Sequence, residues 1–488
     1  MTTRQQSREL LGAVRSYRAA NGWRILADFA ELLALDNQTQ DLPSLRRNAT
    51  AIAAMFAARG ATTEVIEEDG AAPLVVGHLG AGPERPTLGV YVHYDGQPTG
   101  SGWHTPPFDP VLRAASGETV PFPSAGAPVD DDWRLFARGA ADDKAPLMAL
   151  LAALDAISAA GYSPAVNLAL CFEGEEESGS PHLRTYLERL RDRLRADAWL
   201  ICDGPVHHTG APQIALGVRG FCGFELTVYG PGRELHSGHY GNWAPNPALD
   251  LVWLLASFKD SGGRVAIDGF YDTTQPPTAA ELAALRELPA VEPALLDELG
   301  LAAAEVPESR LVDRLMLPSL NIRGIAAGAV GAAARNVIPS EAHASVDIRL
   351  AAGDRPERVL RLVREHIARR GFHLLDREPT HAERRRHRHL ARLDPDVGYP
   401  AARTPADLPI VAHLVEVAAR AAGRPALTVP TLGGSVPLHH IAEVLAAPTV
   451  IVPIANPDNN QHAANENLRL GQLWYGIDLW SLLLTSQW

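Results

Sequence analysis

The sequence predicts an α/β fold in which a mostly parallel central sheet is interrupted by a smaller inserted α/β sandwich unit. Three nearly continuous apolar runs, 88–94 (LGVYVHY), 166–172 (VNLALCF) and 198–202 (AWLIC), have the composition of parallel strands buried on both faces. A strong helical pattern at 144–160 separates the first two runs, which is the alternation expected of an α/β sheet. The buried-strand pattern returns at 448–454 (PTVIVPI) after a stretch of different character. We therefore expect one catalytic domain that is built from two separate parts of the chain.

Composition excludes several classes of protein. The 44 Lys and Arg against 57 Asp and Glu give a formal net charge of −13, which disfavours a nucleic-acid partner. No stretch reaches the ~20 apolar residues that a membrane-spanning helix needs, and the polar N-terminus shows no secretory signal. Three scattered cysteines cannot form a disulfide framework and indicate a reducing compartment. We therefore expect a cytoplasmic enzyme with no membrane partner and, at this length, roughly two to three domains.

The other elements follow in chain order around these strands. Helical patterns occupy 24–35 and 45–59, ahead of the first strand. In the middle of the chain, strands at 221–229 and 342–350 accompany helices at 246–258 and 356–369, which predicts a separate sheet covered on one face. The basic, polar run 378–389 is interpreted as a solvated linker. The expected division is 1–210 with 396–488 for the catalytic domain and 211–395 for the inserted lid or dimerisation domain.

Histidines and carboxylates follow the predicted strands, where ligands bind in open α/β sheets. Taken singly, each could be a turn former or a helix cap. Together, carboxylates beside apolar strands would repel one another unless cations neutralise them. Histidine with carboxylate ligands suits zinc, and also manganese or cobalt. The residues at this edge are His93 and Asp95, then Asp142, the run 173–177 (EGEEE), Asp203 and His462.

Six short motifs lie at or near these positions or in the middle of the chain: VHYDGQP (92–98), RGAADDKAP (138–146), EGEEESGS (173–180), LHSGHYGN (235–242), NVIP (336–339) and GGSVPL (433–438). In combination they resemble the motifs of the di-zinc metallopeptidases and amidohydrolases, a family that includes carnosinase-like dipeptidases, aminoacylases and acetylornithine deacetylase. The forms EESGS, HSGHYGN and GGSVP are closer to the carnosinase-like dipeptidases than to the deacetylases.

The resemblance implies a site with two divalent metal ions. His93 and Asp203 would hold one ion, Glu177 and His462 the other, and Asp142 would bridge them. Asp95 would orient His93, and Glu176 would be the general base. A shift of one position would make Glu175 the base, and His439 or His440 is an alternative to His462. The family often has a cis peptide after the bridging aspartate, so we expect one between Asp142 and Asp143.

The resemblance also assigns substrate binding to the inserted domain. His236 would reach the active site of a partner subunit and stabilise the oxyanion, or else be a loop histidine held by its glycine-rich turn. Arg349 would pair with a substrate carboxylate, unless it is a strand arginine paired with an acid of its own domain. Asn336, Gly434 and Ser435 are weaker candidates for contacts with substrate. A histidine acting on the partner requires a homodimer.

We expect a metal-dependent hydrolase that cleaves the amide bond of a dipeptide, or a similar aminoacyl compound with a free carboxylate. An amidohydrolase acting on N-acyl or N-carbamoyl amino acids is the alternative within the same family. A non-catalytic binding protein on this scaffold is a further alternative, but it would lack a ligand or the base. Every ligand and the base are present in the sequence.

Overall fold

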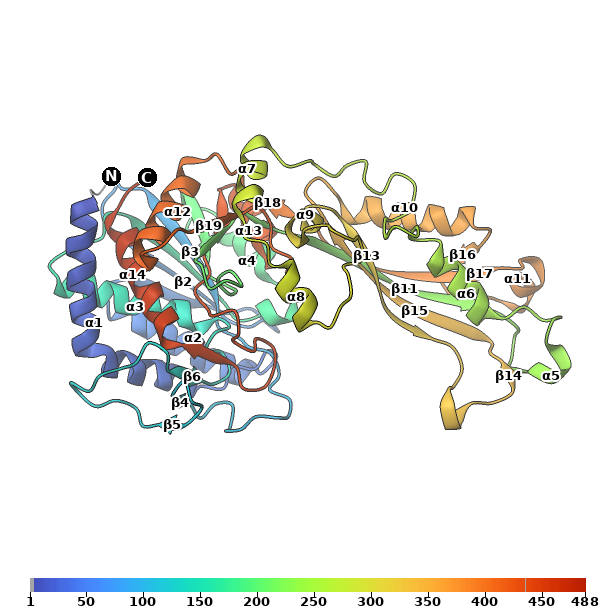
Figure 1. Ribbon diagram of the computed structural model, residues 1–488, viewed down its shortest axis with the longest axis horizontal. Coiled ribbons are helices and arrows are strands. Elements are labelled where there is room, and N and C mark those ends of the chain that lie inside the picture. Colours follow the sequence, from blue (N-terminus) through green and yellow to red (C-terminus); the bar gives the residue numbers. More distant parts are fainter. Residues whose placement is uncertain (1–3, 435) are drawn as a thin grey trace.

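The computed structural model describes residues 4–434 and 436–488 and shows two sheets connected by a narrow ribbon of two strands (Figure 1). The larger sheet has eight strands and contains both ends of the described chain in its helical layers. The smaller sheet has five strands and extends away from the larger one, so the molecule is elongated. This confirms the predicted fold class.

The strands of the larger sheet include all those predicted from the apolar runs. Its order is β1 (Thr62–Ile66), β2 (Leu74–Leu79), β7 (Asn167–Glu173), β3 (Thr87–His93), β8 (Ala198–Ile201), β20 (Thr449–Ile451), β9 (Gln213–Ala215) and β19 (Leu427–Val429). The four neighbours β7, β3, β8 and β20 are parallel, so their carboxyl ends share one edge.

Helices cover both faces of this sheet. One face carries α1 (Arg4–Leu33), α2 (Leu42–Ala57), α3 (Lys144–Ala159), α12 (Pro409–Ala422) and α14 (Leu470–Thr485), and the other carries α4 (Leu183–Leu190) and α13 (Leu438–Leu445). In β7, Leu170 and Phe172 pack in the first layer while Ala169 and Cys171 pack in the second. Burial on both faces is why the strand sequence is apolar without alternation. Among the described residues, no helix is both long and apolar enough to span a bilayer.

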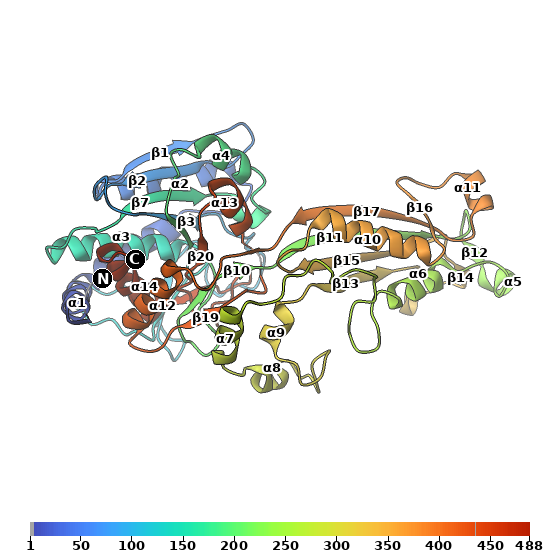
Figure 2. The same ribbon diagram turned by 90° about the horizontal axis from the view of Figure 1, so that it is seen from above.

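The smaller sheet is covered by helices on one face only, as expected. Its order is β13 (Ser319–Ala326), β15 (Glu341–Leu350), β11 (Gly220–Tyr229), β17 (Leu390–Tyr399) and β16 (His373–Leu375). Helices α6 (Pro247–Ala256) and α10 (Pro356–Arg369) lie side by side on it, and their apolar residues form a separate core with the strands (Figure 2).

Short elements complete the chain. A four-stranded sheet has the order β21 (Asn467–Arg469), β6 (Arg134–Phe136), β4 (Val111–Arg113) and β5 (Thr119–Val120). The far end of the smaller sheet carries the pair β12 (Leu235–His236) and β14 (Val337–Ile338), followed in space by α5 (Ser237–Tyr240). The others are η1 (Glu176–Ser178), α7 (Ala279–Glu287), α8 (Glu292–Glu298), α9 (Leu311–Leu315), η2 (Gly331–Ala333) and α11 (His381–Arg386).

The ribbon between the sheets consists of β10 (Gly217–Val218) and β18 (Ala402–Arg403). Strand β9 still belongs to the larger sheet and β17 to the smaller one, so we place the boundaries of the inserted part, expected at 211 and 395, at this ribbon. Helix α7 belongs to the inserted part of the chain but packs against the larger sheet, where Leu285 is part of the apolar core. Glu281 on α7 forms a buried ion pair of 2.9 Å with Arg403 of the ribbon. This contact between α7 and the ribbon was not predicted from the sequence.

The interpretation of 378–389 as a linker was wrong. This segment lies within the inserted part and includes α11, between β16 and β17 of the smaller sheet. Thr380 and Glu383 form a capping box, in which each side chain accepts a hydrogen bond from the other residue's backbone N–H. The box stabilises the start of a short helix in a polar sequence.

Candidate metal centre

Four of the predicted ligand segments follow the four parallel strands, and Asp142 comes from a turn that reaches the same edge. His93 is the last residue of β3, Asp203 follows β8, and the turn η1 after β7 carries Glu176 and Glu177. Asp142 stands just before α3, and His462 is in the loop after β20. Because these strands are neighbours in the sheet, side chains from five distant segments meet at one edge.

Asp142 lies between the two histidines. Its Oδ1 is 2.9 Å from Nε2 of His93, and its Oδ2 is 3.1 Å from Nε2 of His462. His462 Nε2 also lies 3.2 Å from Oε2 of Glu177, and His93 Nε2 lies 4.0 Å from Oδ2 of Asp203. The peptide bond between Asp142 and Asp143 is cis, as expected. One carboxylate thus presents an oxygen to each of two neighbouring groups of ligands.

These two groups have the composition of cation sites. One group is His93, Glu176 and Asp203, and the other is Asp142, Glu177 and His462; within each, one ligand atom per residue lies within 4.8 Å of the others. Asp142 Oδ2 is buried and accepts no hydrogen bond from a described residue, although His462 is close. A buried carboxylate oxygen without a donor fits a cation, and imidazole with carboxylate oxygens suits zinc-type ions.

Two further side chains hold the ligands in place. Asp95 is fully buried and accepts hydrogen bonds from the backbone N–H groups of Glu176 (3.2 Å) and Glu177 (3.1 Å). Its Oδ1 also lies 3.4 Å from Nδ1 of His93, so it can orient that ring. Gln97 donates from Nε2 to Oε2 of Glu177 at 2.9 Å. No role was predicted for Gln97, although it lies within the VHYDGQP motif.

The alternatives left open by the sequence occupy other environments. Glu175 accepts hydrogen bonds from the N–H of Ala72 (2.9 Å) and from Nδ1 of His182 (2.8 Å), and it belongs to neither group of ligands. His439 lies in helix α13 and stacks on Tyr399 with ring centroids 4.6 Å apart. His440 follows in the same helix, so both are packing residues in this structure.

Burial and mutual proximity perturb the pKa values of these groups. Burial lowers the pKa of His93, but hydrogen bonds to Asp142 and Asp95 outweigh it and raise that pKa well above its usual value. The carboxylates of Asp142 and Glu177, 3.1 and 3.2 Å from Nε2 of His462, raise the pKa of His462 to about 10. Burial raises the pKa of Asp203 to about 7. Burial also raises the pKa of Glu176 well above its usual range, which suits a group that takes up and releases a proton.

The loop of His462 is held by side-chain amides. Asn460, His462 and Asn465 all have positive φ, at 57°, 61° and 63°. This left-handed conformation costs about 1 kcal/mol for a residue with a Cβ, so other contacts must offset it. Asn467 donates from Nδ2 to the carbonyls of Asn459 (3.3 Å) and Asn465 (3.2 Å), closing the loop. The network presents His462 toward Asp142.

The residues expected to bind substrate lie outside this cluster. His236 and Asn336 lie together at the far end of the smaller sheet, where Ser237 N–H donates to the Asn336 carbonyl at 2.9 Å (Figure 1). His236 is exposed, and its Nδ1 accepts from Gly238 N–H at 3.1 Å. Arg349 is on β15, with its guanidinium 5.3 Å from the ring of Phe221.

Gly434 lies in the exposed loop before α13. Ser435 is outside the described residues.

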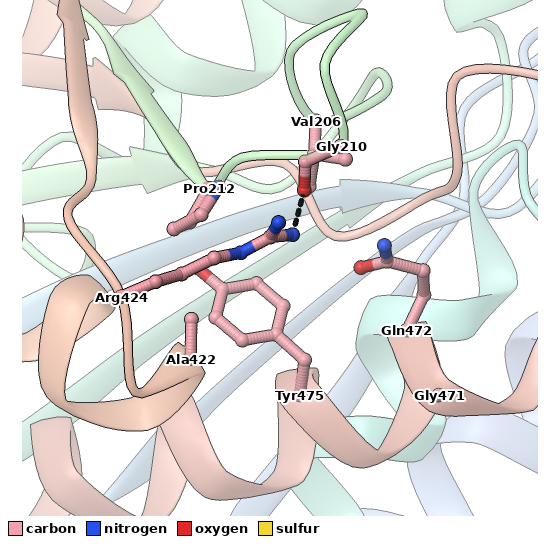
Figure 3. Close-up of a pocket in the computed structure, with 8 residues that line it drawn as sticks. All are labelled: Val206, Gly210, Pro212, Ala422, Arg424, Gly471, Gln472 and Tyr475. Atoms are coloured by element: carbon pink, nitrogen blue, oxygen red, sulfur yellow. Dashed lines mark hydrogen bonds between the residues drawn. The ribbon is translucent and has the colours of Figure 1, made fainter.

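A separate cavity of about 240 Å³ lies between the segment 206–212, the end of α12 and the start of α14. Figure 3 shows Arg424 reaching across it above Tyr475, with a hydrogen bond to the carbonyl of Gly210. Its lining contains no histidine and no carboxylate, so it lacks the ligands of the cluster. The lining residues are Val206, Gly210, Pro212, Ala422, Arg424, Gly471, Gln472 and Tyr475.

Comparison with known families gives a match over most of the chain. Residues 89–486 match the profile of peptidase family M20/M25/M40. The Cys-Gly metallodipeptidase of Schizosaccharomyces pombe is 31% identical over 303 residues, which are 61% of this chain and 60% of the relative. The Beta-Ala-His dipeptidase of Mus musculus is 30% identical over 301 residues, 60% of this chain and 58% of the relative. The chain thus aligns with about three fifths of the length of these relatives.

A solved structure resembles almost the whole chain. It is an M20 family metallo-carboxypeptidase from Sulfolobus solfataricus, with a TM-score of 0.78 and 26% sequence identity. The alignment covers 94% of this chain and 98% of that one. The larger sheet and the smaller sheet of the present structure, with their helices, therefore both have counterparts in a solved structure.

Cation binding to the metal-stripped protein is expected to release protons at pH 7. His93 and His462 have raised pKa values and carry protons there, whereas a metal ligand must be a neutral imidazole. Affinity for zinc should accordingly rise with pH. Isothermal titration in buffers of different ionisation enthalpy measures the protons released per ion. Zinc binding without proton release would show that these histidines are not ligands.

Proposed function

The chain belongs to peptidase family M20/M25/M40, and on this premise we propose that it is a metal-dependent dipeptidase. The proposed reaction is hydrolysis of the peptide bond of a dipeptide, or of a similar small aminoacyl compound, with a free carboxylate. The two relatives described above are dipeptidases by name. Hydrolysis of N-acyl or N-carbamoyl amino acids is therefore not favoured. The same relatives and the complete set of ligands also argue against a non-catalytic binding protein.

The observation that carries the proposal is the position of Asp142 between two histidines, each within 3.1 Å of one of its oxygens. It supports two divalent ions, with His93 and Asp203 at one, Glu177 and His462 at the other, and Asp142 shared. Zinc is the expected metal, with manganese or cobalt as alternatives. Such ions would supply Lewis acidity that polarises the scissile carbonyl and acidifies water.

Glu176 is proposed as the general base. Its carboxylate lies in the group of His93 and Asp203, while its backbone N–H is fixed by Asp95. Burial favours its protonated form, so it can take a proton from the attacking water and pass it to the leaving amine. Asp95 acts through its neighbours, by holding His93 and the turn that carries the base.

Recognition of the substrate carboxylate is proposed for Arg349. It is half-exposed on the smaller sheet, and its Nε lies 3.6 Å from Oδ2 of Asp347. Because it lies near the ribbon-side end of β15, opposite Phe221, a closing movement of the inserted part could bring it to the site. Gly434 and Ser435, in the loop before α13, are weaker candidates for contacts with the scissile group, and Asn336 would act beside His236.

A homodimer is proposed through the inserted part. His236 lies at its far end and is not near the cluster of its own chain, so it can contribute only to a partner's site in this arrangement (Figure 1). An unpartnered apolar surface supports association: on and beside α6, the exposed fractions are 79% for Trp243 and 63% for Trp253. The edge strand β13 also exposes Ile325.

The proposal is tested with metal-stripped enzyme, restored with zinc or manganese, on dipeptides beside N-acetyl and N-carbamoyl amino acids. We expect cleavage of dipeptides only after metal is restored. Glu176→Gln should bind metal like the wild type but lose kcat by roughly three orders of magnitude or more, because the proton acceptor is removed. Initial rates and metal content of both proteins are measured together.

Two outcomes would contradict these assignments. Activity confined to the N-acetyl and N-carbamoyl amino acids would show that the enzyme is an amidohydrolase of such compounds rather than a dipeptidase. Near-normal turnover of Glu176→Gln would exclude Glu176 as the base, whereas Glu175→Gln serves as the matched control and should retain metal-dependent turnover.

The role of His236 is tested by co-expressing two inactive variants, His236→Ala and Glu176→Gln. If His236 completes the partner's site, each mixed dimer has one intact site, and statistical assembly restores about one quarter of wild-type activity. If His236 acts within its own chain, no mixture recovers activity. Light scattering on the wild type should give the mass of a dimer, and a monomer of full activity would exclude the proposal.

A further inference from the structure

A second carboxylate near the candidate metal centre has no role in the mechanism above. Glu466 follows His462 by four residues, and its side chain has no exposed surface. It accepts four hydrogen bonds. Oε2 accepts from Nη1 of Arg138 (2.8 Å) and from Gly139 N–H (3.1 Å), and Oε1 accepts from Ala141 N–H (2.9 Å) and Asp142 N–H (3.0 Å).

These donors form the turn that leads to the shared aspartate. Gly139 has a φ of 78°, so the turn depends on a conformation that suits glycine. The carbonyl of Glu466 also accepts from Ala137 N–H at 3.2 Å, which fixes the turn from both main chain and side chain. Arg138 is buried as well, with its guanidinium 5.3 Å from the ring of Trp103. It supplies the charge that balances Glu466.

The same residue is rigidly connected to the loop of His462. Directly after Glu466, strand β21 pairs with β6, and the side chain of Asn467 closes the loop through the carbonyls of Asn459 and Asn465. The side-chain oxygen of Asn465 in turn accepts a hydrogen bond from the N–H of His104 at 2.8 Å. Glu466 therefore stands between two segments that are more than 300 positions apart in the chain and that carry two ligands of one group.

We propose that Glu466 is a positioning residue that joins the turn of Asp142 to the loop of His462 and thereby preforms the cation site of Asp142, Glu177 and His462. The inference rests on the proposed function. The ion of His93 and Asp203 depends on Glu466 less, because those two ligands extend directly from β3 and β8 and only the shared Asp142 lies on a segment that Glu466 holds. Loss of Glu466 should affect the two ions unequally.

The test is zinc binding to metal-stripped Glu466→Gln, measured by competition with a chromophoric chelator. The glutamine amide would replace one acceptor oxygen with an NH₂ group that faces other N–H donors. The two hydrogen bonds to that oxygen, from Arg138 and Gly139 or from Ala141 and Asp142, would be lost. Losing a residue that orients ligands costs about 10- to 100-fold in metal affinity. We expect the ion of Glu177 and His462 to bind more weakly by that factor, and the ion of His93 and Asp203 to weaken by a smaller factor because only its shared ligand Asp142 is affected. Excess zinc should restore kcat, which a general loss of structure would not allow.

Asp458→Asn is the matched control. Asp458 is an acid of the same loop, but it is half-exposed and pairs with Arg134 rather than with the turn of Asp142. Its substitution should leave both affinities unchanged. Should Glu466→Gln fail to fold, Glu466→Asp provides a second test, because its shorter side chain cannot reach both pairs of donors.

The outcomes separate this inference from the proposed function. If the wild type binds two zinc ions and Glu466→Gln binds both equally well, or weakens both equally, the positioning role is overturned and the dipeptidase proposal stands. If the wild type binds none of zinc, manganese and cobalt, the proposed function itself fails.

Discussion

The carboxylate of Asp142 lies between the imidazoles of His93 and His462, with further acids on the same sheet edge. Such a concentration of buried acids is unfavourable unless positive charge compensates it. In the metal-free protein the histidines supply that charge by retaining protons, which is why their pKa values are raised. Divalent cations can replace those protons, so the electrostatics that strain the site also give it affinity for metal.

The fold meets this constraint in two ways. Parallel strands bring His93 and Asp203 to one edge, where helices on both faces of the sheet exclude water. The candidate ligands Asp142 and His462 instead come from irregular segments, which are held by buried hydrogen bonds such as those of Glu466. The site thus combines strand ends with loops that polar contacts hold in place.

The sequence predicted the parts of this structure that depend on local patterns. Continuous apolar runs indicated the strands, and the polar residues that follow them indicated the cluster of candidate ligands. Contacts between distant segments were not predictable: nothing in the sequence links Glu466 to Asp142, Gln97 to Glu177, or α7 to the ribbon through Glu281. The linker expected at 378–389 contains a helix because a capping box offsets its polar composition. The family resemblance placed Arg349 and His236 near the substrate, but their positions here require movement or a second chain.

The most direct test of the account is the anomalous diffraction of crystals grown with zinc, recorded at the zinc absorption edge. The account predicts two peaks on either side of Asp142, one beside His93 and Asp203 and one beside Glu177 and His462. A single peak, or peaks that do not touch Asp142, would contradict the claim that this aspartate is shared by two metal ions.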